Sequence, residues 1–70
     1  MFNRPSRAEV DNVVFHIALD KEPISFREME KLAKDTLPNI ASNMVIRKSV
    51  WRLIGRQKLQ INNQLKISIK

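Results

Sequence analysis

The spacing of the apolar residues changes once along this chain, and the change limits the folds that the chain can adopt. Up to Ile54 the apolar residues recur every three or four positions, which is the period of a helix with one buried face. From Leu59 to Ile69 most of them alternate with polar residues, which is the period of a β-strand. The sequence therefore predicts an α+β domain in which helices are followed by a C-terminal hairpin.

Two sequences of the form Ser-x-x-Glu predict where the first two helices begin. In this capping box the serine hydroxyl accepts a hydrogen bond from the amide three residues later. The two capping boxes are Ser6 to Glu9 and Ser25 to Glu28. Pro23 and Pro38 disfavour helix in the residues before them, so we expect the first helix to end near Asp20 and the second near Thr36.

The third helix is predicted to begin between residues 38 and 43, because either Thr36 or Ser42 could cap it. Its apolar stripe consists of Ile46, Val50, Leu53 and Ile54. Its other side carries only basic and amide side chains, namely Asn43, Arg47, Lys48, Arg52 and Arg56. A helix face of this composition is typical of a surface that binds polyphosphate.

The net charge of +6 is concentrated in the second half of the chain. Residues 36–70 contain seven basic and no acidic side chains, whereas residues 1–35 contain six basic and seven acidic ones. Nucleic acid, an acidic protein surface and an anionic membrane would all attract such a half. A membrane is the weakest of these three, because the basic helix has few large apolar anchors outside its core stripe.

The hairpin register is predicted from the need to keep one face apolar. A loop at residues 62–64 would pair Ile61 with Leu65 and Leu59 with Ile67, which places all four side chains on the same face. Asparagine tolerates the left-handed backbone conformation that such a loop requires.

We expect a small core in this 70-residue chain. The predicted core residues are Val14, Ile17, Leu32, Ile46, Val50, Leu53, Leu59 and Ile67. Met29 and Met44 are predicted to fill further space in the core. Trp51 is expected to pack under the hairpin, and the alternative is that it stacks on a base or in the groove of a partner.

Several function classes are disfavoured by residues that the chain lacks. Without cysteine it can form neither a disulfide nor a thiolate metal site, and its one histidine, His16, cannot build a zinc site alone. Its one glycine, Gly55, cannot form a glycine-rich phosphate loop. We therefore expect no enzyme, no catalytic residue, no metal and no cofactor. No run of 18 apolar residues and no signal peptide is evident, so we expect a cytoplasmic or nucleoid-associated protein.

The order of the predicted elements resembles the winged helix-turn-helix superfamily. The resemblance is carried by Ile-Ser-Phe-Arg-Glu-Met-Glu-Lys-Leu-Ala at residues 24–33 and by Val50, Leu53, Leu59 and Ile61. Two features differ from that superfamily: the connection after Ala33 is longer than the usual tight turn, and Gln57-Lys58 replaces the glycine that commonly precedes the first wing strand. The length predicts one domain over residues 1–70, which the resemblance makes a winged helix-turn-helix domain. Residues 1–5 are expected to form a flexible arm before the first helix, and Ile24 could add a short third strand.

This resemblance implies a small double-stranded DNA-binding protein, a transcription regulator of the kind that suits phage or plasmid genomes. The third helix would enter the major groove and the hairpin would be the wing. Arg47 and Arg52 could each be bidentate to guanine and Asn43 to adenine, while the lysines would contact phosphates. The predicted DNA-binding residues are Asn43, Arg47, Lys48, Arg52, Arg56, Lys58, Asn63 and Lys66.

Three alternatives stay open at this point. The chain could be a winged-helix module that binds or inhibits a nucleic-acid enzyme through an acidic surface of that enzyme. It could also bind RNA, although aromatic residues for stacking are few. A homodimer formed through the first helix, Phe15 and the N-terminal arm is a further option.

Overall fold

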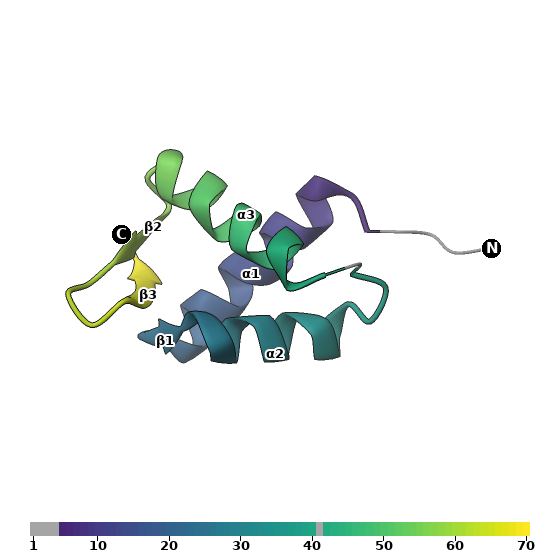
Figure 1. The fold of residues 1–70 in the computed structure, drawn as a ribbon. Helices are drawn as coiled ribbons and strands as arrows, with labels where there is room; N and C mark the ends of the chain where they lie inside the picture. The colour runs from purple at the N-terminus through teal and green to yellow at the C-terminus, as the bar shows by residue number, and fades with distance from the viewer. Residues whose placement is uncertain (1–4, 41) are drawn as a thin grey trace.

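The structure, a computed structural model, describes residues 5–40 and 42–70. Its elements are α1 (Arg7–Lys21), β1 (Ile24–Ser25), α2 (Phe26–Thr36), α3 (Asn43–Gly55), β2 (Leu59–Ile61) and β3 (Lys66–Ile69). Figure 1 shows the three helices packed together, with the small sheet at one end and the connection from α2 to α3 at the other. The α+β class and the predicted order of elements are confirmed, and Ile24 does add a third strand. Most of the predicted arm, residues 1–4, lies outside the described residues.

Helices α1 and α2 each begin directly after the serine that was predicted to cap it. The Ser6 hydroxyl accepts a hydrogen bond from the Glu9 amide at 3.2 Å, and the Ser25 hydroxyl accepts one from the Glu28 amide at 3.2 Å. The third helix begins within its predicted interval, although the Ser42 side chain makes no capping hydrogen bond.

The core lies between the three helices and one face of the sheet. Its buried apolar residues are Val10, Val14, Ala18, Ile24, Met29, Ala33, Ile40, Ile46, Val50, Leu53, Leu59 and Ile67. The prediction is correct for six of its eight residues, whereas Ile17 and Leu32 are only partly buried at the edge of this core. Ile40 was not predicted. It belongs to the connection between α2 and α3, and its burial fixes this longer connection against the helices.

The predicted hairpin register is wrong by two residues along β3, which moves the loop by one position. Ile61 pairs with Ile67 and Leu59 with Ile69, so the loop comprises residues 63–65. The Asn62 side-chain oxygen accepts hydrogen bonds from the amides of Gln64 and Lys66. These two bonds stabilise the observed turn, and the apolar face is kept because Ile69 takes the place expected for Ile67.

Leu65 leaves the sheet as a result of this register. It adopts a positive φ of 60° at the end of the turn, and it is 69 % exposed. The Leu65 amide donates to the Asn62 carbonyl at 3.0 Å, which closes a tight turn before the left-handed residue. A three-residue hairpin loop often has this geometry.

The turn after α3 has a backbone conformation that glycine usually adopts, but this chain has another residue there. The Gln57 amide donates to the Ile54 carbonyl and the Lys58 amide to the Leu53 carbonyl, each at 2.9 Å. This pair of bonds is the Schellman motif, whose left-handed residue is usually glycine. Gln57 occupies that position with a φ of 61°.

Replacing Gln57 with glycine should therefore stabilise the fold. A side chain in the left-handed region clashes with its own backbone and glycine does not, so we expect the free energy of unfolding to rise by about 0.5–1 kcal/mol. Urea denaturation followed by circular dichroism would measure the change. Gln57→Ala is the matched control, because it also removes the 3.4 Å contact between Gln57 and Lys70 but keeps the Cβ atom. Equal stability of the two variants would contradict the strain argument.

Candidate nucleic-acid interface

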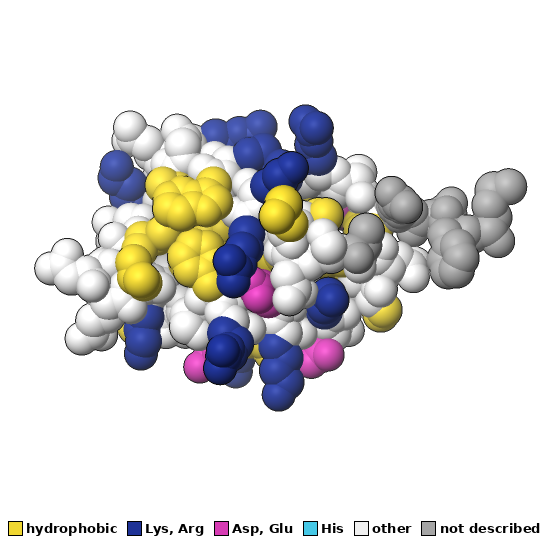
Figure 2. All heavy atoms as spheres, viewed as in Figure 1, with side chains coloured by type: hydrophobic (Ala, Val, Ile, Leu, Met, Phe, Trp, Pro, Cys, Tyr) yellow, Lys and Arg dark blue, Asp and Glu magenta, His cyan; other side chains and the backbone are white. Residues whose placement is uncertain are grey.

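The exposed face of α3 carries four long side chains at helical spacing: Met44, Arg47, Lys48 and Trp51. Two of them are large and apolar, with Met44 61 % and Trp51 58 % exposed. The prediction that Met44 fills the core is therefore wrong. Figure 2 shows hydrophobic side chains on this side of the molecule with Lys and Arg side chains between and around them.

Trp51 also differs from its prediction, because it does not pack under the hairpin. Its ring lies against Phe26 of α2, with the ring centroids 6.0 Å apart and the planes tilted by 32°. Phe26 is itself partly buried and packs against the core. One side of the indole is thus supported by α2 while more than half of the residue faces solvent.

Arg47 is held by a carboxylate from the neighbouring helix. Its Nε donates to Oε2 of Glu30 at 2.6 Å, and Glu30 is buried whereas the Arg47 side chain is 59 % exposed. The pair ties α3 to α2 and directs the guanidinium. It also lowers the net positive charge of this face below what the sequence of α3 alone indicated.

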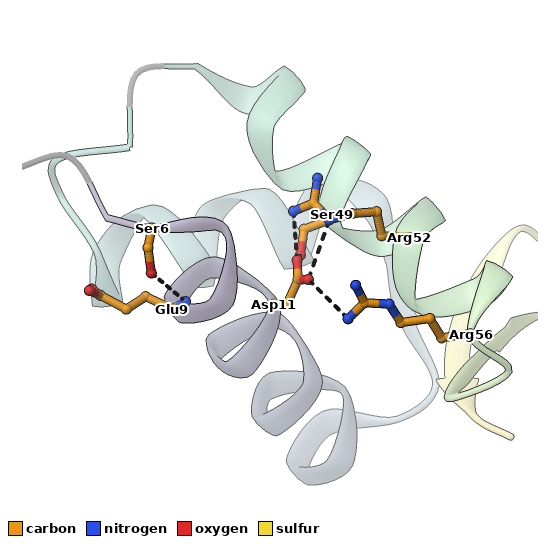
Figure 3. Close-up of polar contacts among 6 residues, drawn as sticks. All are labelled: Ser6, Glu9, Asp11, Ser49, Arg52 and Arg56. Carbon is orange, nitrogen blue, oxygen red and sulfur yellow. Dashed lines mark hydrogen bonds and ion pairs between the residues drawn. The ribbon is translucent and has the colours of Figure 1, made fainter.

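Arg52 points to α1 rather than outwards. Its Nη2 donates to Oδ1 of Asp11 at 2.7 Å and its Nε to Oδ2 at 3.3 Å, so the pair is bidentate (Figure 3). Asp11 is buried, and the Arg52 side chain is only 28 % exposed. The expectation that Arg52 reads a guanine does not fit this placement, because its donors already bind a carboxylate.

Two further residues of α3 complete the cluster around Asp11. The Ser49 hydroxyl, which is fully buried, donates to Oδ1 of Asp11, and Nη1 of Arg56 lies 3.9 Å from Oδ2 (Figure 3). Burial alone would raise the pKa of the Asp11 carboxyl. The hydrogen bonds from Arg52 and Ser49 and the charges of Arg52 and Arg56 outweigh burial, so the pKa lies below its ordinary value.

The positions of both carboxylates in the sequence indicate that they face inwards. This signal lies on α1 and α2, not on α3. Asp11 is three and seven positions before the buried Val14 and Ala18, and Glu30 is three positions before the buried Ala33. Each carboxylate therefore lies at a spacing that belongs to the buried face of its own helix. A charged residue at such a position indicates a partner on another element.

The remaining predicted site residues are Asn43 on α3, Lys58 between α3 and β2, and Asn63 and Lys66 on the hairpin. The Lys58 ammonium lies 5.9 Å from the centroid of the Phe15 ring on α1. Asn63 and Lys66 are exposed on the hairpin, Asn63 in its loop and Lys66 at the start of β3, and Asn43 is exposed at the start of α3.

The predicted residues thus form three groups rather than one face. Asn43, Arg47 and Lys48 share the outward side of α3 with Met44 and Trp51. The second group contacts α1, and its members are Arg52, Arg56 and Lys58. Asn63 and Lys66 form the third group, on the hairpin.

Within the described ranges, no cluster of three His, Cys, Asp or Glu residues could hold a metal ion. None of the helices that the structure describes has the length and apolar character needed to cross a membrane. Comparisons with protein-family models, curated proteins and solved structures find no match.

Proposed function

We propose that this protein binds double-stranded DNA as a winged helix-turn-helix regulator, with α3 in the major groove and the β2–β3 hairpin as the wing. The observation that carries the proposal is the outward face of α3, where Arg47 and Lys48 are exposed beside Asn43 and no acidic residue occurs within the helix. Because the α-helix fits the major groove, such a face can place donors against base edges and phosphates together.

The contacts of the individual residues suggest a division of roles. Glu30 binds Nε of Arg47, so the terminal nitrogens of Arg47 can donate to a guanine edge. Lys48, together with Lys66 and Asn63 on the hairpin, suits phosphates, and Asn43 suits adenine. Arg52 acts as a positioning residue, because its pair with Asp11 fixes α3 against α1.

A second candidate function is binding to an acidic surface of a nucleic-acid enzyme. The observation that favours it is the exposure of Trp51 beside basic residues, since tryptophan and arginine are common hot-spot residues of protein interfaces. Any affinity for duplex DNA would then come from charge attraction alone and be equal for every DNA sequence, which separates the two candidates.

Titration of a labelled DNA duplex at several salt concentrations tests the proposal directly. Two phosphate contacts, from Lys48 and Lys66, would give a slope of log affinity against log salt of about −2. Fluorescence anisotropy would supply the affinities. Absence of binding at low salt would refute the proposed function.

Replacing Lys48 with alanine should weaken binding to all duplexes alike. A lost phosphate contact carries no sequence information, so we expect the salt slope to become shallower by about one unit on every duplex. Lys21→Ala is the control, because Lys21 is exposed at the end of α1 and lies 3.8 Å from Asp20. An effect of the same size in both variants would mean that only total charge matters.

A further inference from the structure

Apolar and basic side chains alternate on the outward face of α3, and this pattern is not explained by phosphate binding. Met44 and Trp51 are more than half exposed, and Arg47 and Lys48 lie between them in sequence and on the same face. Large apolar side chains that gather on one exposed face indicate an interaction surface. A phosphate-binding surface needs neither of them.

Two contacts from α2 hold this face in one arrangement. The Phe26 ring supports Trp51, and the Glu30 carboxylate binds Arg47 at 2.6 Å. Phe26 and Glu30 both belong to α2, which packs against α3. The indole and the guanidinium are therefore positioned before any ligand binds, as is expected for side chains that make specific contacts.

We propose that Met44 and Trp51 contact thymine methyl groups in the major groove. This inference rests on the proposed function and adds the chemical feature that the outward face would recognise. In the major groove the thymine C5-methyl is the apolar group among donors and acceptors, and apolar side chains are its complement. Arg47 and Lys48 would meet the polar edges between the methyl groups.

The helix geometry sets the spacing of the two contacts. Met44 and Trp51 are seven residues apart, which is about 10 Å along a helix at 1.5 Å per residue. That distance corresponds to about three base pairs of B-DNA. Because a helix that follows the groove is inclined to the DNA axis, this distance is the upper limit, and the two contacts would fall on thymines at most about three base pairs apart.

The alternation of apolar and basic groups along this face is the feature that favours a DNA occupant. Tryptophan and arginine are also common in protein hot spots, so a protein partner is the competing outcome of the test below. Figure 2 shows one contiguous hydrophobic patch on this face and Lys and Arg side chains between that patch and the hydrophobic side chains further along. Base-pair edges present apolar and polar groups at similarly short intervals.

The test compares two alternating duplexes, one of deoxyadenosine and thymidine and one of deoxyadenosine and deoxyuridine. They differ in the C5-methyl group alone. We expect the uracil duplex to bind about 3- to 10-fold more weakly, because each methyl that leaves water contributes to affinity. The salt slope should be the same for both duplexes, since phosphate contacts are unchanged.

Variants separate direct methyl contact from a change in duplex stiffness. In Trp51→Ala and Met44→Ala the ratio of the two affinities should fall towards one, because each variant removes a partner of the methyl group. Met44 is highly exposed, so its variant is expected to fold even if Trp51→Ala does not. Leu19→Ala is the control, since Leu19 is 54 % exposed on α1 and should leave the ratio unchanged.

The outcomes distinguish this inference from the function on which it rests. Equal affinity for the two duplexes, or a ratio that both variants keep, overturns the methyl contacts while duplex binding still supports the proposed function. In that case the apolar pair would belong to a protein partner. Loss of all duplex binding refutes the proposed function itself, and the methyl contacts with it.

Discussion

Replacing Leu53 with alanine is expected to lower the free energy of unfolding by about 2–5 kcal/mol. Leu53 is 3 % exposed in the core, on the helix that packs against both α1 and β2. Truncation would leave a cavity that three elements line, and a domain of this size has little stability to lose. Urea denaturation followed by circular dichroism would measure the loss.

The control for this prediction is Leu19→Ala, which removes the same atoms from an exposed position on α1. Its stability should differ from that of the wild type by less than about 0.5 kcal/mol. If Leu53→Ala were as stable as the control, the packing of α3 described above would be wrong.

Replacing Asp11 with asparagine is expected to cost about 1–3 kcal/mol at neutral pH. The carboxylate accepts from Arg52 and Ser49, and it lies near Arg56. Asparagine has a similar shape but no charge, so Arg52 would lose its bidentate partner while it stays partly buried. Asp20→Asn is the matched control, because the side chain of Asp20 is 76 % exposed.

The pH dependence of stability gives an independent test of the same cluster. The pKa of Asp11 is lower in the folded protein than its ordinary value of 3.8, so the folded state stabilises the charged form. This contribution is fully present from about one pH unit above that value, and it disappears as the pH falls through the lower folded-state pKa. The stability difference between wild type and Asp11→Asn should therefore shrink in acid, and a difference independent of pH would contradict the role of the charge.

The helices could be predicted from the sequence because each signal for them is local. The serines before α1 and α2 bond the amides three residues on, and the apolar spacing places Val14 and Val50 in the core. The hairpin register could not be predicted in the same way. Two registers keep the apolar face, and the hydrogen bonds of the Asn62 side chain, which a face pattern does not reveal, stabilise the observed turn.

The basic residues of the candidate site could be predicted from the sequence. The acidic residues with which they pair could not. Spacing along α3 identified Arg47 and Arg52 as one basic face, but Glu30 and Asp11 come from the other two helices. The residue pattern of a single helix does not reveal pairs between helices. For the same reason Trp51 was assigned to the hairpin, although its aromatic neighbour Phe26 begins α2.

The central place of β3 in the sheet affects how the protein can fold as it is synthesised. β3 pairs with β1 on one side and with β2 on the other, and β1 and β2 do not pair with each other. While the ribosome is still adding residues 66–69, the three helices are complete but neither of the earlier strands has a partner. Folding of the sheet must then wait for translation of β3, because neither β1 nor β2 has a partner strand before it.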